Sequence, residues 1–299
     1  VHWPGTASPM RTSSLEAIAG QILVAGFAGQ QVPDDLAVLA RGGALGGFIV
    51  FKRNLGSARE VADLTAGLRA LAPAERPLWI AIDQEGGRVA RLGAPVVQLP
   101  AARVFGEIDD PALTREAGRV LGRQLGWLGF NLDFAPVLDV HTNPDNTVIG
   151  DRSYGNDVTV VIRHASAFAA GLAAAGIASC GKHFPGHGDT LLDSHFALPR
   201  LPHSQDRLRA VELAPFAALA LTLPCLMTAH VVFDAWDSAV PATLSRAVIG
   251  LLRDEIGFAG LIFSDDLEMN AILENYGIED AVCRAVEAGW DVTIVSSDK

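Results

Sequence analysis

The sequence predicts a single-domain α/β protein with the (β/α)₈ barrel fold of the TIM type. Eight apolar runs, each bounded by Gly or Pro, alternate with helical patterns along the 299-residue chain. Strands that are apolar almost throughout are typical of a parallel sheet covered by helices, and eight of them close a barrel. An open doubly wound sheet is the alternative. It would carry a Gly-rich phosphate-binding turn after an early strand, and the Phe-Ala-Gly-Gln segment at 27–30 does not supply one.

The elements follow one another in a regular order. We expect strands over residues 21–27, 47–51, 78–83, 131–135, 176–180, 224–230, 261–266 and 291–295. We expect helices over residues 13–20, 33–41, 57–71, 110–129, 157–175, 204–221, 245–256 and 278–288. Two of these helices begin with capping signals. Ser57 and Glu60 form a capping box, and Asp110 is an N-cap followed by Pro111 at the first helical position.

No repeat, low-complexity tract or linker interrupts this pattern, so we expect residues 1–299 to form one barrel domain. The sequence reaches Lys299 four residues after the eighth strand. A barrel normally has a last helix that covers this strand. We therefore expect that helix to be missing from the sequence, or its place to be taken by another element or a partner chain.

Charge and cysteine content narrow the class of protein. The formal charge of -11 argues against a nucleic acid or an anionic membrane as partner. Cys180, Cys225 and Cys283 lie far apart and fit buried reduced thiols better than disulfides or a zinc site. The first residues lack a signal-peptide layout, and no stretch is long and apolar enough to span a bilayer. We expect a cytoplasmic monomer, with a secreted form left open because a leader can be absent from the sequence.

The richest chemistry lies in the segment 181–195, which follows the fifth predicted strand. It contains Lys182, three His and two Asp, and Gly and Pro fix the shape of the loop. Catalytic groups tend to lie on loops that a rigid scaffold positions. A polar surface loop is the alternative interpretation, but so many ionisable groups in so short a segment favour a functional site.

Charged residues also end other predicted strands. They are Asp83 after the third strand, Asp139 and Arg152 after the fourth, Lys182 and His183 after the fifth, His230 after the sixth, and Asp265 and Asp266 after the seventh. The C-terminal ends of the strands form the mouth of a TIM barrel, where its active sites lie. Single strand-end charges are often helix caps or salt bridges, but five strands with such ends predict a polar ligand.

Two chemistries fit such a mouth. Metal-dependent hydrolysis requires a cluster of His and Asp ligands. No His-x-His pair occurs, and Pro185 and Gly186 break the helical spacing of His183 and His187, so we do not expect a bound metal. Glycoside cleavage instead requires a carboxylate and a proton donor.

The glycosidase interpretation finds candidates for both roles. Adjacent strand residues point to opposite faces, so only one of Asp265 and Asp266 is expected to face the pocket, and the alternation does not say which. Asp193 and His195 share a face if the chain is extended there, so Asp193 can orient the His195 ring. An imidazole has an unperturbed pKa of about 6.5, which suits proton exchange near neutral pH.

Four motifs resemble glycoside hydrolase family 3 β-N-acetylglucosaminidases of the single-domain NagZ type, and they occur in that family's order. They are Asp-Gln-Glu-Gly-Gly-Arg-Val at 83–89, Val-Ile-Gly-Asp-Arg-Ser-Tyr at 148–154, Lys-His-Phe-Pro-Gly-His-Gly-Asp-Thr at 182–190 with Asp-Ser-His at 193–195, and Phe-Ser-Asp-Asp-Leu-Glu-Met at 263–269. The resemblance covers residues from about 20 to 295.

The resemblance implies a role for each matching residue. Asp265 matches the nucleophile that forms a covalent glycosyl-enzyme, His195 the general acid/base, and Asp193 the partner of that histidine. The residues that match those gripping the terminal N-acetylglucosamine are Asp83, Arg152, Lys182 and His183. Asp266, His187 and Asp189 match supporting residues. Many family members take a Glu acid/base from a second domain, for which this chain has no room. A second departure from the family pattern is that the sequence reaches Lys299 soon after the eighth predicted strand.

We therefore expect a retaining exo-β-N-acetylglucosaminidase that releases terminal N-acetylglucosamine from peptidoglycan-derived sugars, with muropeptides among its substrates. Within the same class, a phosphorylase that uses phosphate in place of water, or a β-glucosidase, is the alternative. A non-catalytic sugar-binding barrel is the alternative from another class. The combination of Asp265, Asp193 and His195 favours an enzyme, because a protein that only binds sugar does not need it.

Overall fold

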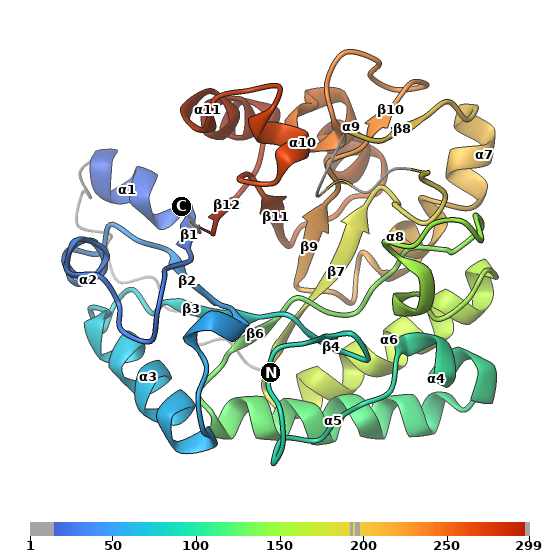
Figure 1. Cartoon of the computed structure of the whole chain (residues 1–299). Coiled ribbons are helices and arrows are strands. Elements are labelled where there is room, and N and C mark those ends of the chain that lie inside the picture. Colours follow the sequence, from blue (N-terminus) through green and yellow to red (C-terminus); the bar gives the residue numbers. More distant parts are fainter. Residues whose placement is uncertain (1–14, 192–193, 195–197, 297–299) are drawn as a thin grey trace.

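The computed structural model describes residues 15–191, 194 and 198–296, and it contains a closed parallel barrel (Figure 1). Its strands are β1 Leu23–Ala25, β2 Gly47–Val50, β3 Trp79–Ile82, β6 Leu132–Asp133, β7 Ala178–Phe184, β9 Cys225–Thr228, β11 Leu261–Asp266 and β12 Val292–Val295. Each strand pairs in parallel with the next one along the chain, and β12 closes the ring against β1. The eight predicted strands and the predicted fold class are confirmed.

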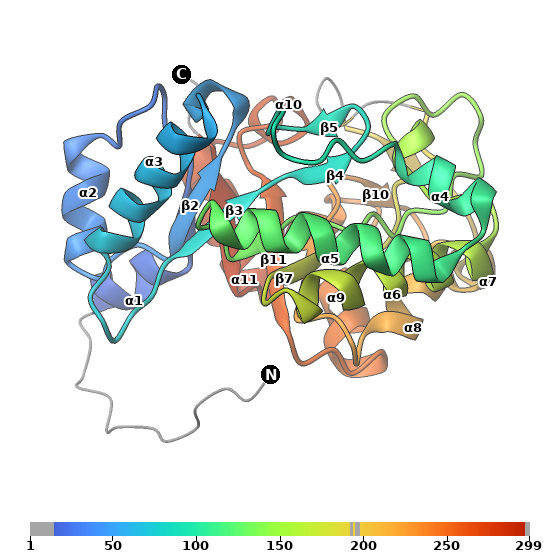
Figure 2. The same ribbon diagram turned by 90° about the horizontal axis from the view of Figure 1, so that it is seen from below.

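Helices lie around the barrel, as the alternating pattern predicts (Figure 1), and α3 and α5 cover the side that faces the viewer in Figure 2. They are α1 Leu15–Gln21, α2 Asp34–Arg41, α3 Ala58–Leu71, α5 Pro111–Trp127, α6 Val158–Ala174, α7 Gln205–Ala210, α8 Ala214–Leu219, α9 Arg246–Gly250 and α11 Ile278–Ala288. Both capping predictions are confirmed. Ser57 accepts a hydrogen bond from the Glu60 N–H in a reciprocal capping box, and Asp110 accepts from two backbone N–H groups of α5.

The two longest helices, α5 and α6, pack tightly against each other because glycines face the contact. A Cβ atom on Gly118 would lie 2.5 Å from the carbonyl oxygen of Phe168, and one on Gly171 would lie 2.2 Å from that of Arg115. Any other side chain at these two positions would push the helices apart. The close packing fixes the outer wall behind β6 and β7, which carry part of the site.

Two helix predictions need correction. The segment 204–221 forms two short helices, α7 and α8, and Pro215 lies at the start of the second, where its missing N–H breaks no helical hydrogen bond. The segment 245–256 begins as α9 and continues as a π-helical turn, Leu251–Glu255.

Several short elements were not predicted from the sequence. They are the helices α4 Ala102–Ile108 and α10 Asn270–Leu273, the 3₁₀ turns Lys52–Asn54, Gly150–Arg152 and Ala242–Leu244, the hairpin of β4 Gln84–Gly86 with β5 Val89–Ala90, and the pair β8 Arg200–Leu201 with β10 Val232–Phe233. They lie in the loops that connect strands to helices, where short polar segments carry little periodic signal.

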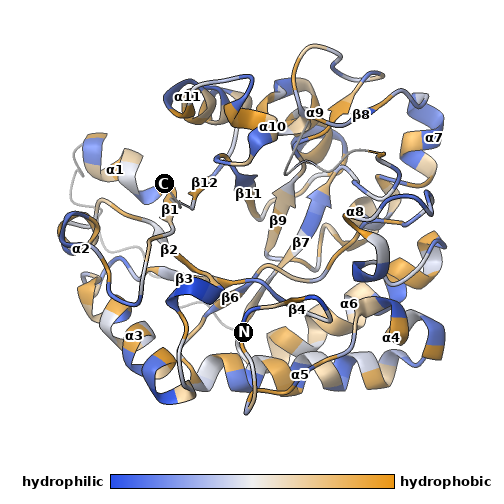
Figure 3. Ribbon diagram, in the orientation of Figure 1, coloured by the Kyte–Doolittle hydropathy of each residue, from blue (hydrophilic) through white to orange (hydrophobic). Residues whose placement is uncertain are grey.

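The apolar residues form two layers. Residues inside the barrel, among them Cys180, Cys225 and Phe263, pack against one another across its axis. A larger cluster fills the space between the strands and the outer helices. Hydrophilic residues appear at the ends of β7 and β11, where the site lies (Figure 3). Cys180 and Cys225 are buried, as predicted, but Cys283 lies exposed on α11, so the expectation of a buried thiol is wrong for this residue.

An apolar groove of about 1060 Å³ lies between α1, α2 and α11, over the outer side of β1 and β12. Leu15 and Ile18 of α1 and Val286 of α11 line it and remain well exposed. The sequence predicts that a further element or a partner chain covers β12, and such an element would occupy this groove. That remains a prediction. Among the described residues, no helix is long and apolar enough to cross a membrane.

Candidate active site

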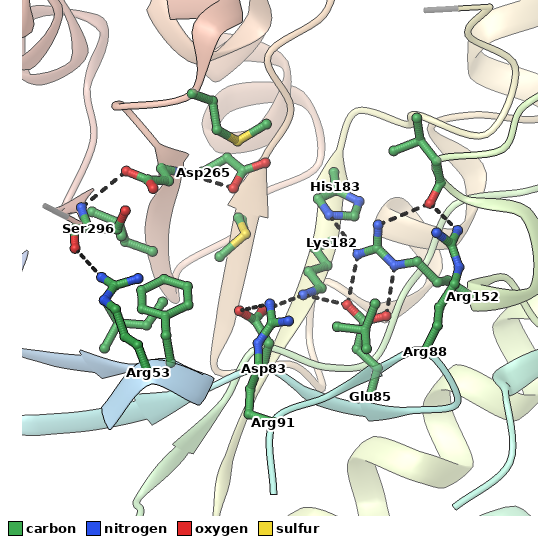
Figure 4. Close-up of a pocket in the computed structure, with 18 residues that line it drawn as sticks. Arg53, Asp83, Glu85, Arg88, Arg91, Arg152, Lys182, His183, Asp265 and Ser296 are labelled. Atoms are coloured by element: carbon green, nitrogen blue, oxygen red, sulfur yellow. Dashed lines mark hydrogen bonds and ion pairs between the residues drawn. The ribbon is translucent and has the colours of Figure 1, made fainter. Parts of the chain in front are cut away.

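A polar pocket of about 370 Å³ opens at the C-terminal ends of the barrel strands (Figure 4). It is lined by residues from β2, β4, β5, β7, β9, β11, β12 and the loops that follow the strands. The charged residues of the lining are Arg53, Asp83, Glu85, Arg88, Arg91, Arg152, Lys182, His183, Asp265 and Asp266. The strand-end charges that the sequence singled out at 83, 152, 182, 183, 265 and 266 therefore meet in one cavity.

A buried lysine lies at the centre of one wall. The Nζ atom of Lys182 is 2.8 Å from Oδ1 of Asp83 and 2.7 Å from Oε1 of Glu85, and its side chain is 3% exposed. Burial lowers the pKa of Lys182, but the two carboxylates outweigh that effect and raise it above its ordinary value. Lys182 is thus a fixed positive charge that two carboxylates hold in the lining of the pocket.

The two carboxylates are fixed in their charged forms by the cations around them. Burial raises the pKa of Glu85, but Arg152 and Lys182 outweigh it and bring the pKa to about 2. Burial likewise raises the pKa of Asp83, and Lys182 with Arg91 outweighs it and holds the pKa well below its usual range. Arg152 binds Glu85 with two hydrogen bonds of 2.9 and 2.8 Å. The wall is therefore an alternating network of opposite charges.

Two residues of this network, Glu85 and Arg91, were not singled out individually from the sequence. The hairpin of β4 and β5 folds the chain back so that Glu85 and Arg91 face the same wall as Asp83. Gly86 and Gly87 form the turn with positive φ angles of 106° and 55°, which most other residues avoid. The two adjacent glycines after Glu85 are the sequence signal that could have predicted this turn.

His183 lies next to the lysine with a defined ring orientation. Its Nδ1 atom is 2.7 Å from Oδ2 of the fully buried Asp139, and its Nε2 atom is 3.3 Å from Nη2 of Arg152. A guanidinium group only donates hydrogen bonds, so Nε2 is the acceptor and Nδ1–H donates to the carboxylate. Burial raises the pKa of Asp139, but His183 outweighs it and the net shift is downward. Asp139 thus presents His183 to the pocket.

His187 lies behind the pocket rather than in its lining. Its Nε2 atom is 3.0 Å from Oγ of Ser194, and its Nδ1 atom is 2.8 Å from Oγ1 of Thr190. Burial lowers the pKa of His187 to about 4, and the nearby His183 adds to this effect. A neutral, enclosed imidazole fits the supporting role that the resemblance implied for this residue. The predicted acid/base His195 and its partner Asp193 flank Ser194, and both lie outside the described residues.

The two aspartates that end β11 both contribute to the lining of the pocket. The expectation that only one of them reaches the pocket is therefore wrong. The pairing of β11 with β12 shifts register between Phe263 and Asp266, which breaks the strict alternation of side chains. The carboxylate of Asp266 accepts hydrogen bonds from the backbone N–H groups of Glu268 and Ser296, so it is partly engaged by the loops. Burial raises the pKa of Asp266 to about 6, and the neighbouring Asp265 adds to the shift.

A second cluster of ionisable groups lies outside this pocket. Ligand atoms of Asp189, His203 and Glu212 lie within 4.8 Å of one another. The side chains of Asp189 and His203 contact each other, and Arg207 lies 3.0 Å from the buried Glu212. Both carboxylates of this cluster therefore already have a partner within the protein.

Comparison with known proteins identifies the class. Residues 15–299 match the glycosyl hydrolase family 3 N-terminal domain. The chain belongs to this family, and it is a glycoside hydrolase. Both the barrel and the polar pocket at its C-terminal mouth agree with this assignment.

Particular relatives refine the comparison. The chain is 39% identical over 285 residues to the β-hexosaminidase of Alkalilimnicola ehrlichii, and the match covers 91% of this chain and 80% of that protein. A family 3 β-N-acetylglucosaminidase from Paenibacillus is 46% identical with a TM-score of 0.91, and the match covers 95% of this chain but only 55% of that one. NagZ from Neisseria gonorrhoeae, solved with N-trifluoroacetyl-D-glucosamine, is 38% identical with a TM-score of 0.83, and the match covers 92% and 81% of the two chains.

Proposed function

We propose that this glycoside hydrolase is a retaining exo-β-N-acetylglucosaminidase. Support comes from relatives that are named β-hexosaminidases and β-N-acetylglucosaminidases and that match more than nine-tenths of this chain. The observation that carries the proposal is the pocket itself. A carboxylate, Asp265, and a wall of paired charges around Lys182 line one cavity of a size that suits a single sugar ring.

In this proposal the charged wall binds the hydroxyl groups of the terminal sugar. Asp83 accepts hydrogen bonds from hydroxyls, while Lys182 and Arg152 donate them. His183 lies beside Arg152, with its ring fixed by Asp139. Because every one of these groups already has a partner, the wall is rigid before sugar binds, and little side-chain entropy is lost on binding.

Asp265 is the proposed nucleophile. In a retaining mechanism a carboxylate attacks the anomeric carbon, the glycosidic bond breaks with proton donation to the leaving oxygen, and water then cleaves the glycosyl ester. The Asp266 N–H donates to Oδ1 of Asp265 at 2.8 Å, which orients the carboxylate. The raised pKa of Asp266 limits the negative charge beside the nucleophile at and below about pH 6.

His195 is the proposed general acid/base and Asp193 its partner. A histidine can protonate the leaving oxygen in the first step and accept a proton from water in the second. The anchoring of Ser194 by His187 ties the segment between these two residues to the body of the barrel. We propose that residues 186–199 act as a gating loop that brings His195 to the sugar once the contact between His187 and Ser194 opens.

We further propose that the substrates are peptidoglycan-derived sugars such as muropeptides, that the protein works as a cytoplasmic monomer in cell-wall recycling, and that it needs no cofactor. Phosphorolysis is the alternative within the class, since a histidine acid/base tolerates an incoming phosphate better than a glutamate does.

The decisive experiment compares chromogenic β-N-acetylglucosaminide and β-glucoside substrates, each with and without inorganic phosphate. We expect release of the chromophore from the N-acetylglucosaminide, little from the glucoside, and free N-acetylglucosamine as product. Formation of the sugar 1-phosphate would favour the phosphorylase. Preference for the glucoside would favour a β-glucosidase, and sugar binding without turnover of any substrate would indicate a binding protein.

A further inference from the structure

Asp133 is a buried carboxyl group that the proposed mechanism does not use. It ends β6, directly beside the end of β3, and it is fully buried. Its Oδ1 atom accepts a hydrogen bond of 2.9 Å from the backbone N–H of Gln84. Its Oδ2 atom is also buried and has no hydrogen-bond partner among the described residues. Oδ1 therefore holds the Gln84 N–H, whereas Oδ2 makes no hydrogen bond to the described residues.

The hydrogen bond from the Gln84 N–H to Oδ1 of Asp133 affects the pocket because Gln84 adjoins residues that line it. Gln84 stands between Asp83 and Glu85, the two carboxylates that contact Lys182. The side chain of Gln84 is also engaged: its Oε1 atom accepts from the N–H of Arg91 at 2.8 Å and from that of Leu92 at 3.0 Å. Asp133 thus anchors the backbone of Gln84. Gln84 is covalently linked to Asp83 and Glu85, and its side chain holds the backbone of Arg91.

The charges around Asp133 leave no cation to balance it. The ionisable groups near it are Asp83 and Glu85 from the neighbouring strand ends, Lys182 from β7, and the buried Tyr154 and Cys180, whose raised pKa values keep them uncharged. Lys182 is already held by the first two, and Arg152 and Arg91 complete their pairing. A third carboxylate charge in this corner would be buried without a partner, which is costly. Burial raises the pKa of Asp133 well above its ordinary value, and Asp83 and Glu85 add to the shift.

We infer that Asp133 is a positioning residue that acts as an uncharged carboxylic acid, holding Asp83 and Glu85 against Lys182 through the Gln84 N–H. The inference rests on the proposed function, because the consequence for sugar binding follows only if this wall grips the substrate. What the site requires at position 133 is a hydrogen-bond acceptor of the right length. A negative charge there is not required.

Two substitutions separate the acceptor from the charge. Asp133→Asn keeps an acceptor oxygen and can carry no charge, so we expect kcat and KM for a chromogenic N-acetylglucosaminide within about threefold of the unmodified enzyme. Asp133→Ala leaves the buried Gln84 N–H without an acceptor. We expect KM to rise by about five- to hundredfold, the range that corresponds to an unsatisfied buried donor. Rescue by Asn but not by Ala is the signature of a positioning role.

Thermal unfolding between pH 5 and 9 tests the uncharged state without any use of activity. An ordinary Asp has a pKa of about 3.9 in the unfolded chain. Because the pKa of Asp133 is higher in the folded state, the unfolded state releases this proton first, and stability is lost as pH rises from that value toward the folded pKa. Asn does not titrate, so the Tm of Asp133→Asn should rise relative to that of the unmodified protein as pH rises.

Asp139→Asn is the matched control for the stability measurement. Asp139 is also fully buried at the mouth, but its pKa is lowered by His183. Its stabilising effect is complete above the unfolded pKa, so the deficit of Asp139→Asn should be constant from about pH 7.5 to 9, above the range in which imidazoles ordinarily titrate. The inference is overturned if Asp133→Asn shows the same constant deficit, or if it loses substrate binding as Asp133→Ala does. Should the enzyme turn over no N-acetylglucosaminide at all, the proposed function fails, while the unfolding experiment still decides the state of Asp133.

Discussion

The imidazole of His187 and the hydroxyl of Ser194 are joined by a hydrogen bond of 3.0 Å that connects the end of β7 to the loop beyond it. Both residues are almost fully buried. Ser194 stands between the predicted partner Asp193 and the predicted acid/base His195. The contact therefore holds the middle of the segment that would deliver the proton. The protonation state of His187 determines whether its Nε2 atom donates or accepts the hydrogen bond to Ser194.

We expect His187 to contribute to acid sensitivity. Its pKa is about 4 in the folded state, against about 6.5 for an unperturbed histidine. The unfolded state binds the proton first as pH falls, so stability should decrease between about pH 6.5 and 4, by about 1.4 kcal/mol per pH unit from this group. His187→Gln should flatten that part of the stability profile, measured by urea unfolding. Ser194→Ala, which keeps the imidazole, is the control and should retain the slope.

The general acid role of His195 should appear in the dependence on the leaving group. His195→Ala should lose most activity on substrates with basic leaving groups, and much less in the glycosylation step with a nitrophenolate, which needs little protonation. Asp193→Ala should show a weaker form of the same pattern. The measurement is kcat/KM over a series of aryl N-acetylglucosaminides. Equal losses on good and poor leaving groups would contradict the role and indicate that His195 is a structural residue.

Asp265 and Asp266 should respond differently to truncation. Asp265→Ala should abolish turnover while the protein stays folded. Asp266→Ala should act mainly on folding, because the N–H groups of Glu268 and Ser296 lose their acceptor. A fluorinated sugar that traps the glycosyl-enzyme, followed by peptide mass mapping, should locate the ester on Asp265. An ester on Asp266, or on no carboxylate, would refute the assignment.

Removal of Lys182 should cost stability as well as binding. Lys182→Met leaves two buried carboxylates without their shared cation, and breaking a buried ion pair in this way typically costs about 3–5 kcal/mol. Urea unfolding measures the loss. The control is Arg59→Ala, which breaks the exposed pair with Asp63 and should change stability by less than about 1 kcal/mol. A small effect of Lys182→Met would show that the charged wall is not a rigid network.

Activity should not depend on a metal ion. Dialysis against EDTA should leave hydrolysis of the N-acetylglucosaminide unchanged, because the pocket wall stabilises charge with paired side chains. The cluster of Asp189, His203 and Glu212 offers an internal check, since a metal acting there would make His203→Gln behave like chelation. Loss of activity in EDTA that zinc restores would replace the glycosidase proposal with a metal-dependent hydrolase.

The sequence predicted the barrel because its signals are local and repeated. Eight apolar runs and two capping motifs are readable without any knowledge of long-range contacts, and all eight strands and both caps are present. Position 215 shows the limit of such signals. An apolar helical pattern ran through Pro215, but the chain breaks there into α7 and α8, because a proline suits the start of a helix better than its interior.

The sequence by itself determined which strand ends carry charge, and therefore that Asp83, Arg152, Lys182, His183 and Asp265 would lie around one mouth. Only the tertiary structure decided how those charges pair. Glu85 and Arg91 enter the wall through the turn of the β4–β5 hairpin, Asp266 joins Asp265 through a register shift, and Asp133 acts on Gln84 from the neighbouring strand. The physical reason is range: strand periodicity follows from neighbours in sequence, whereas the pairing and protonation of a buried group depend on residues distant along the chain that the closed barrel brings within hydrogen-bonding distance.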